Sequence, residues 1–556
     1  MGETAAPLME RSRTWASQGW AFLRRHTLLV PLFLLALFLR LNGLTPTFFY
    51  GDDAEYAAVA RSLAANPLNL EYPNLLHWDA QPFVSQPPVV LYLMAMGIWI
   101  GGATPDAVVV TVAVLGALTI PVVYGIGTVW RNRATGVAAA VLLAVMPYHV
   151  RVSRTAFVDA GFALMLCLAI LCALLWYQRR TTRWAALAGV TAGLALLSKL
   201  PGILILPVLG LFVLVEAAYL GYRAYRDRAE LQALKTFGKH VGVAFGSLAG
   251  VVLACLLLLV ANSGLDDLGY KLLWQLGRVR PEALPPHLAA VFMQELTATH
   301  REWTWYLTNE HYGLVKLVGI PDLLLGVGGI LLVAIEGFVR RRRDAVLLVA
   351  WPLIFALFFA SASRKEWFYL MPLVPAIAVL AGNVPGAVVE AASGLFVKAR
   401  SAWHRPAAAV ALLAVFALAA VPAYAHAEYS STRMQGKVFG AGYDEAAAYI
   451  DENAPPGTGQ IGNLLGRYTL YWYNERPTYH WYVDHQTLER LIEIGHLKYL
   501  VTDNYLPLEF QDGYFDMLIR KYHGESVKRV QVEWGVVEVW EFHPEKAGNG
   551  TAAQAG

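Results

Sequence analysis

Residues 26–56 read HTLLVPLFLLALFLRLNGLTPTFFYGDDAEY. The first part, 26–44, is an apolar run of the length that crosses the roughly 30 Å hydrocarbon core of a bilayer. No small-residue cleavage site follows this run, so it predicts a membrane anchor rather than a cleaved signal peptide. A cluster of acidic residues comes shortly after it. The stretch therefore predicts a spanning helix followed by a charged segment at the membrane surface.

The composition of all 556 residues agrees with a membrane protein. Apolar residues make up 57% and charged residues only 15%, whereas an ordinary soluble domain carries about 25% charged residues. This deficit excludes a soluble enzyme. The net charge of +3 gives no basic field for nucleic acid. The cysteines all lie in apolar runs, which excludes a disulfide framework and a thiolate metal site; they are Cys167, Cys172 and Cys255.

Positively charged clusters decide the topology, because loops rich in Lys and Arg stay in the cytoplasm. Further apolar runs lie at 84–102, 108–129, 134–150, 157–177, 184–198, 200–220, 240–262, 316–338, 345–362, 366–390 and 406–424. The basic clusters lie at 11–25, 131–133, 179–183, 223–239, 340–343 and 398–405. They all fall on one side only if the run 84–102 does not span, and Gln86-Pro87-Pro88 at its start favours a surface or re-entrant helix.

We therefore expect an α-helical polytopic membrane protein with about eleven transmembrane helices and a cytoplasmic N-terminus. Residues 1–424 form its transmembrane domain, with an amphipathic first outer loop; the outer loops are 45–107, 151–158, 263–315 and 363–366. Residues 425–556 form a small extracytoplasmic α/β domain with a disordered tail. In this domain, alternating patterns predict strands at 527–533 and 536–540, and helices are predicted at 444–453 and 486–495.

The acidic cluster after the first helix is the first candidate for chemistry. Asp52, Asp53 and Glu55 lie within four positions, followed by Tyr56. Carboxylates placed so closely suit a general base or a divalent cation. The alternative is structural: Asp52 or Asp53 would be the N-cap of a helix over 54–64.

Cations at the same predicted face form the second candidate. The second outer loop carries Arg151 and Arg154 and ends at Asp159, and Lys199 interrupts a long apolar stretch. Arg364 and Lys365 add charge in a further loop. Each cation alone is typical of an interfacial anchor. Together, facing an acidic cluster, they favour binding of an anionic lipid head group beside a base for sugar transfer.

A set of patterns occurs in order along residues 26–390: Asp52-Asp53-Ala54-Glu55-Tyr56, Gln86-Pro87-Pro88, Pro147 with Arg154 and Asp159, the stretch 193–201, and Tyr369-Leu370-Met371-Pro372 with Pro375. Together they resemble the polyprenyl-phosphate-sugar-dependent glycosyltransferases of the GT-C fold, in particular the protein O-mannosyltransferases and lipid A aminoarabinose transferases. The sequence departs from that family's pattern at Gln86, where relatives have His or Lys, and at Asp53, where Glu is commoner.

The resemblance implies an inverting single displacement at the outer face, from a polyprenyl-phosphate-linked sugar to a hydroxyl of a glycan, lipid or protein. We expect Asp52 to be the base, Asp53 to support it and Asp159 to orient the acceptor or the sugar. The candidates for the donor phosphate are Arg154, Lys199, Arg364 and Lys365; those for the rest of the substrate pocket are Glu55, Tyr56, Gln86 and Arg151.

Three questions stay open at this point. No cofactor is certain; a divalent cation, Mg or Mn, is possible, with Asp52 and Asp159 as ligands. A secondary transporter or flippase of a lipid-linked anion would also explain charge within the membrane, as would, less completely, a scaffold protein. The aromatic cluster in the C-terminal domain suits either core packing or a platform for the acceptor; it comprises Tyr468, Tyr471, Trp472, Tyr473, Tyr479, Trp481 and Tyr482.

Overall fold

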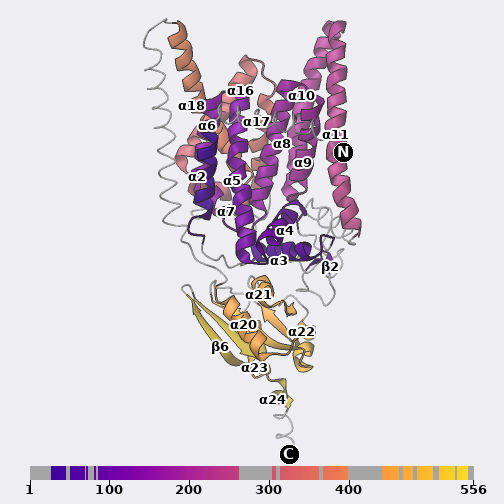
Figure 1. Ribbon diagram of the computed structural model, residues 1–556, viewed down its shortest axis with the longest axis vertical. Helices are drawn as coiled ribbons and strands as arrows, with labels where there is room; N and C mark the ends of the chain where they lie inside the picture. Colours follow the sequence, from indigo (N-terminus) through magenta and orange to yellow (C-terminus); the bar gives the residue numbers. More distant parts are fainter. Residues whose placement is uncertain are drawn as a thin grey trace, which may run out of the picture.

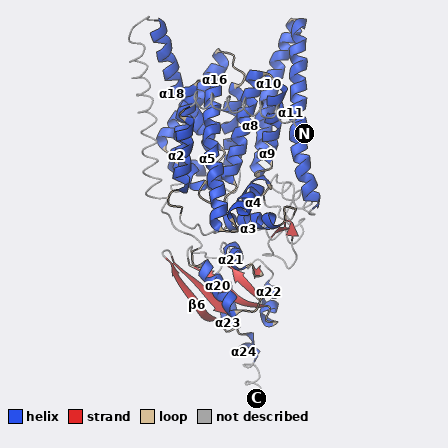
Figure 2. Ribbon diagram, in the orientation of Figure 1, coloured by secondary structure: helices blue, strands red, loops and turns tan. Residues whose placement is uncertain are grey.

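The protein is described here from a computed structural model. The structure describes residues 27–44, 51–68, 71–72, 81–82, 86–261, 304–308, 314–361, 367–398, 441–462, 467–479, 485–504, 512–532 and 535–548. Figure 1 shows a bundle of long helices with a small mixed domain at one of its ends. In Figure 2 most of the strands lie in that domain, apart from one short hairpin beside the bundle.

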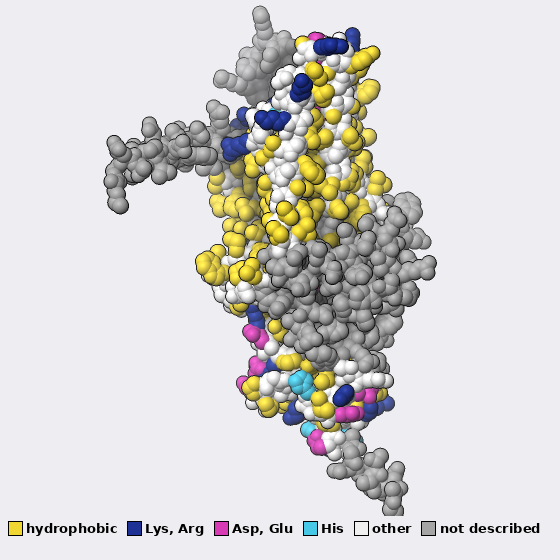
Figure 3. All heavy atoms as spheres, turned by 90° about the vertical axis from the view of Figure 1, so that its right-hand side faces the viewer, with side chains coloured by type: hydrophobic (Ala, Val, Ile, Leu, Met, Phe, Trp, Pro, Cys, Tyr) yellow, Lys and Arg dark blue, Asp and Glu magenta, His cyan; other side chains and the backbone are white. Residues whose placement is uncertain are grey.

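The bundle is built from helices that run roughly along its length in Figure 1. They are α2 (Leu29–Leu41), α5 (Pro105–Trp130), α6 (Arg133–Val145), α8 (Asp159–Arg179), α9 (Thr182–Leu196), α10 (Ile205–Arg226), α11 (Leu231–Ala261), α16 (Ile320–Val339), α17 (Ala345–Ser361) and α18 (Leu373–Lys398). On the face of the bundle that Figure 3 shows, hydrophobic side chains cover much of the described surface, and charged ones gather toward its upper end and on the small domain. This belt is the surface expected in contact with lipid.

The described residues do not confirm the number of spanning helices that the sequence predicts. Among the described residues, six helices are long and apolar enough to cross a membrane, and four shorter helices are also apolar. The predicted run 406–424 lies outside the described residues. The eleven-helix expectation is therefore not confirmed, whereas a multi-pass helical membrane protein is.

Short elements cluster at the end of the bundle that faces the small domain. The helices α3 (Asp52–Ala65) and α4 (Val89–Gly101) pack on each other there, and α4 also packs against α5. The remaining short elements there are the hairpin β1 (Glu71–Tyr72) and β2 (Gln81–Pro82), the helices α7 (Pro147–Val152), α14 (Trp305–Thr308) and α15 (Leu314–Val318), and the 3-10 helices η1 (Leu200–Leu204) and η4 (Trp367–Leu370). A further 3-10 helix, η2 (Arg228–Glu230), links α10 to α11 near the basic end.

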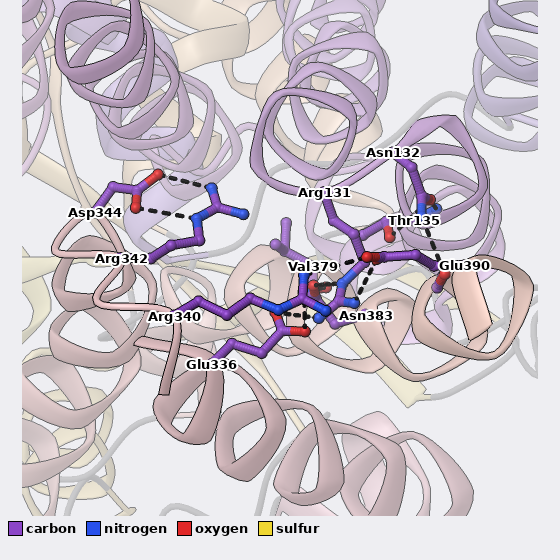
Figure 4. Close-up of polar contacts among 11 residues, drawn as sticks. Arg131, Asn132, Thr135, Glu336, Arg340, Arg342, Asp344, Val379, Asn383 and Glu390 are labelled. Atoms are coloured by element: carbon purple, nitrogen blue, oxygen red, sulfur yellow. Dashed lines mark hydrogen bonds and ion pairs between the residues drawn. The ribbon is translucent and has the colours of Figure 1, made fainter. Parts of the chain in front are cut away.

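The opposite end of the bundle is held by ion pairs between arginines and carboxylates, as Figure 4 shows. Arg131 pairs with Glu336, and its Nη1 lies 3.0 Å from Glu390 Oε2. Arg340 also pairs with Glu390, at 3.2 Å. Elsewhere Glu216 pairs with Arg180 at 2.7 Å and with Arg343 at 2.5 Å. These contacts involve three of the basic clusters found in the sequence, 131–133, 179–183 and 340–343.

The C-terminal domain is a five-stranded sheet in the order β4-β3-β5-β7-β6. Its strands are β3 (Gly459–Gly462), β4 (Thr478–Tyr479), β5 (Leu497–Asp503), β6 (Glu525–Val532) and β7 (Gly535–Glu541); its helices are α20 (Tyr443–Asn453), α21 (Arg467–Asn474), α22 (His485–Glu493), α23 (Asp512–Lys521) and α24 (Pro544–Gly548). β3 pairs parallel with β4 and β5, and the other pairings are antiparallel. The two strands and two helices expected from the sequence are present; the predicted tail beyond Gly548 lies outside the described residues.

Two members of the aromatic cluster of this domain are buried, whereas Trp481, Tyr482 and the side chain of Tyr468 lie outside the described part of the structure. Trp472 and Tyr479 are each only 3% exposed. Trp472 packs into the core of the bundle, and Tyr479 into the core of the domain. Their faces are therefore occupied by protein, which favours the packing interpretation over an acceptor platform for these two residues.

Candidate active site

The acidic cluster forms the first turn of α3. The helix begins at Asp52, and the residue before it, Gly51, is the N-cap with φ of 93°. This backbone conformation is one that glycine adopts without strain. The hypothesis that Asp52 or Asp53 is the N-cap is therefore wrong: both lie inside the helix, where the helix dipole favours carboxylates.

The two aspartates differ in their surroundings. Asp53 is 8% exposed, and its Oδ1 accepts a hydrogen bond of 2.9 Å from the backbone N–H of Ala54. Asp52 is more exposed. A carboxylate that is accessible to an incoming hydroxyl is the better placed base.

A buried ion pair joins the second outer loop to the break between α9 and α10. Lys199 Nζ donates to Asp159 Oδ1 at 2.6 Å, with Lys199 4% and Asp159 1% exposed. Asp159 opens α8, and Pro201 shortly after Lys199 prevents α9 from continuing. Burying two charges is costly, so such a pair at membrane depth is a functional candidate.

The other oxygen of Asp159 has no hydrogen-bond partner. Asp159 Oδ2 is buried, and nothing among the described residues donates to it. A buried acceptor left unpaired costs about 1–3 kcal/mol. A ligand hydroxyl that donates to this oxygen would remove the penalty.

Two aromatic rings face the ammonium of Lys199. Its Nζ lies 4.9 Å from the ring centre of Phe368 and 5.5 Å from that of Tyr369. Both residues belong to η4, at the start of the late aromatic-Leu-x-Pro pattern. The pattern at 369–375 thus lies beside the pattern at 193–201 that contains Lys199. The two aromatic rings stabilise the ammonium without neutralising its charge.

Two buried tyrosines connect the acidic turn with the ion pair. Burial raises the pKa of Tyr56, and the charges of Asp52, Glu55 and Asp159 raise it further. Burial and Asp159 likewise raise the pKa of Tyr148, an effect that nearby Arg151 partly opposes. Both tyrosines therefore keep their protons well above neutral pH and can donate hydrogen bonds.

The Pro-Pro segment is tied to the Lys199 turn through the backbone. The N–H of Val89 donates to the carbonyl of Leu197 at 3.0 Å. Gln86, Pro87 and Pro88 therefore lead into α4 beside this turn. Gln86 Oε1 is buried and, within the described part of the chain, has no hydrogen-bond partner.

Arg154 contacts the end of α2 rather than the ion pair. Its guanidinium donates to the backbone carbonyls of Leu39, Arg40, Asn42 and Gly43 at 2.7–3.3 Å. These are carbonyls that a helix end leaves unpaired. Arg154 thereby fixes the end of the first helix to the second outer loop.

Two of the predicted site residues cannot be placed, and two residues that the sequence did not predict lie at the site. Arg364 and Lys365 lie outside the described residues, as do most of 263–315. Tyr148 and Phe368 lie beside the ion pair but are not among the predicted site residues, although both lie within or next to the quoted patterns.

Among the described residues, no group of three or more His, Cys, Asp or Glu side chains could hold a metal ion. Asp52 and Asp159, the two metal ligands considered from the sequence, thus lack a third ligand among the described residues.

The helical bundle, the acidic helix start and the buried ion pair agree with the resemblance to membrane-embedded GT-C glycosyltransferases that the sequence predicts. Residues 85–221 match the model of the dolichyl-phosphate-mannose-protein mannosyltransferase family. The matched region includes Gln86, Arg154, Asp159 and Lys199. This match, over about a quarter of the chain, agrees with the resemblance to polyprenyl-phosphate-sugar-dependent glycosyltransferases that the sequence patterns suggest.

Solved structures agree at the level of the fold. ArnT from Cupriavidus metallidurans bound to undecaprenyl phosphate is similar with a TM-score of 0.60 and 16% identity, over 93% of this chain and 98% of that one. The archaeal oligosaccharyltransferase AglB from Archaeoglobus fulgidus, in complex with an inhibitory peptide and a dolichol-phosphate, is similar with a TM-score of 0.62 and 17% identity, over 94% of this chain and 74% of that one. No curated protein sequence matches the chain.

Proposed function

We propose that this protein transfers a sugar from a polyprenyl-phosphate donor to an acceptor hydroxyl at the extracytoplasmic membrane face, with inversion at the anomeric carbon. The observation that carries the proposal is the buried Lys199–Asp159 ion pair, whose second carboxylate oxygen is unpaired, within electrostatic range of the acidic turn of α3. A family match over 85–221 supports the donor class, and the similar ArnT structure holds undecaprenyl phosphate.

In the proposed reaction, the Asp52 carboxylate takes the proton of the acceptor hydroxyl as its oxygen attacks the anomeric carbon. The bond between that carbon and the donor phosphate oxygen breaks, and the electron pair leaves with the polyprenyl phosphate. One displacement on one face of the sugar inverts its configuration. Asp53 supports Asp52 from the same helix turn, at an electrostatic cost that the helix dipole reduces.

Lys199 is the cation that we assign to the departing phosphate. A buried ammonium stabilises developing negative charge more strongly than one in water. Asp159 holds the ammonium in place, and its free Oδ2 accepts from a hydroxyl of the sugar or acceptor. Glu55, Tyr56, Gln86 and Arg151 would line the substrate, and Arg364 and Lys365 remain candidates for the phosphate.

Arg154 is assigned a different part. Four backbone carbonyls already occupy its guanidinium. We therefore propose that it shapes the site by fixing the end of α2, and that the phosphate is bound by the remaining cations. The face is assigned from the positive-inside rule, which places the basic end of the bundle in the cytoplasm.

The proposal is tested with the purified protein in liposomes and radiolabelled polyprenyl-phosphate hexoses and pentoses. We expect release of free polyprenyl phosphate. The labelled sugar is then found on an acceptor, or as free sugar after transfer to water. Label that moves into the vesicle lumen with the phosphate bond intact would show a transporter instead. If the protein neither turns over nor transports any of these donors, the glycosyltransferase proposal has no support.

A further inference from the structure

The short helix α21 of the C-terminal domain belongs to two hydrophobic cores. Trp472 packs into the core of the bundle, whereas Leu470 packs into the core of the domain. Tyr473 lies partly buried against both. In Figure 1, α21 lies between the sheet and α3, and the two helices are in contact. The domain is therefore joined to the bundle through the helix that carries the acidic turn.

Arg61 of α3 makes the polar contacts at this junction. Its Nη1 donates to the backbone carbonyl of Trp472 at 2.7 Å, and its guanidinium lies 5.0 Å from the centre of the Trp472 ring. It also forms an ion pair with Glu475. The Arg61 side chain is only 18% exposed. Three contacts to one short segment hold a planar guanidinium in a defined orientation.

The backbone at Glu475 supports a specific role for this ion pair. Glu475 follows the end of α21 with φ of 53°, in the left-handed region. Glycine is the residue that adopts this conformation at helix ends without strain. A glutamate at this position is explained by its carboxylate, which reaches Arg61.

The sequence of α3 shows why its position needs such a clamp. The helix reads DDAEYAAVARSLAA, and alanines make up much of its buried face. Alanine side chains make no polar contacts, so the polar contacts of this helix with the C-terminal domain, among the described residues, come from Arg61. A shift of α3 would move Asp52 and Asp53 relative to the Lys199–Asp159 pair.

We propose that Arg61 is a positioning residue: by binding Trp472 and Glu475 it fixes α3 against the C-terminal domain and holds the acidic turn in the geometry that transfer requires. The inference rests on the proposed function, because it assigns the purpose of that geometry. The C-terminal domain then acts on catalysis by orienting the base-carrying helix.

The test uses full-length Arg61→Met, Arg61→Lys and Glu475→Gln proteins, with Glu489→Gln as matched control. Glu489 pairs with Lys521 inside the domain, away from α3. The donor is the radiolabelled polyprenyl-phosphate sugar that the wild type turns over fastest. The readouts are kcat, the donor dissociation constant and hydrogen exchange of the amides of 52–56.

For Arg61→Met we expect kcat to fall about tenfold or more, because small misplacements of reacting groups are costly. Donor affinity stays within about twofold, and exchange at 52–56 becomes faster. Arg61→Lys recovers only part of kcat, because an ammonium keeps a cation over the ring but not the planar set of donors. Glu475→Gln loses one of the three contacts and lowers kcat less, while Glu489→Gln changes nothing.

Arg61→Met with wild-type kcat, or with unchanged exchange at 52–56, would overturn the inference. So would a loss of kcat accompanied by an equal loss of donor binding, since that indicates general disruption. If the wild type turned over no donor, the proposed function would fail, and the exchange measurement would still decide whether Arg61 clamps α3.

Discussion

At the scale of single residues, Asp159 and Lys199 meet two opposing demands. Burial in an apolar bundle disfavours both charges, and the pair repays this only through close contact. At 2.6 Å the contact is close, but one carboxylate oxygen is left without a partner. An arrangement optimised for stability alone would satisfy that oxygen or replace the pair with apolar side chains. The pair is better explained by binding of a substrate.

This explanation predicts that stability and activity respond differently to the same site. Asp159→Asn leaves a buried ammonium without its counter-ion, which we expect to cost about 3–5 kcal/mol of unfolding free energy. The double variant Asp159→Leu with Lys199→Met removes both charges and should be closer to the wild type in stability. Both variants should be inactive in donor turnover. Thermal unfolding in detergent, together with the turnover assay, measures both effects.

A pair outside the site serves as the control. Lys498 and Glu541 form an ion pair of the same length, but Lys498 is 38% exposed. Lys498→Gln should change the unfolding free energy by less than about 1 kcal/mol. Equal losses from Lys498→Gln and Asp159→Asn would show that the Lys199–Asp159 pair has no special cost.

Sequence reasoning identified the charged residues but could not assign their partners. Lys199 stands out because it interrupts an apolar stretch, and Asp159 because a helix starts there. Their contact joins positions forty residues apart, which no local pattern encodes. The partners of Arg154 are backbone carbonyls, and carbonyls are alike at every residue. The sequence could therefore suggest a phosphate ligand at Arg154 but could not show its occupied guanidinium.

At the scale of helices and strands, local patterns predicted some boundaries well. The break at 198–201 separates α9 from η1, and alternation located β6 and β7. The helix α3 starts two residues earlier than the predicted 54–64, since a glycine with positive φ replaces a side-chain cap. The strand β3 was missed because GQIG is buried throughout and shows no alternation.

Close helix packing at glycines gives a prediction at this scale. A Cβ at Gly329 of α16 would lie 1.8 Å from the carbonyl oxygen of Leu380 in α18, whereas a Cβ at the neighbouring Gly328 would meet nothing closer than 3.7 Å. Gly329→Ala must push the helices apart, so we expect a loss of about 1–3 kcal/mol. Gly328→Ala should be neutral or stabilise by about 0.5–1 kcal/mol through its higher helix propensity. Thermal unfolding of the two variants provides the comparison, and equal behaviour would contradict the packing of α16 on α18.

At the scale of the whole molecule, the two ends of the bundle differ in the charged groups that they carry. One end gathers basic clusters in ion pairs. The other carries the acidic turn of α3, the buried ion pair and the C-terminal domain. From the positive-inside rule we expect the candidate site and this domain to lie at the outer face.

Thiol labelling of intact cells tests this orientation. Asn453 in the domain and Arg228 near the basic end are both exposed, and the native cysteines are buried and give little background. A membrane-impermeant maleimide should label Asn453→Cys in intact cells and Arg228→Cys only after the membrane is opened. The reverse pattern would place the site in the cytoplasm.

The central claim is that the carboxylate at the start of α3 removes the acceptor proton. Its most direct measurement is donor turnover by Asp52→Asn, with binding of undecaprenyl phosphate measured in parallel. Asp106→Asn is the matched control, because Asp106 also lies in the first turn of a helix, α5. We expect Asp52→Asn to lose about 10²–10⁴-fold in turnover, the range of a general base, with binding unchanged and the control fully active. Turnover by Asp52→Asn at the wild-type rate would contradict the account.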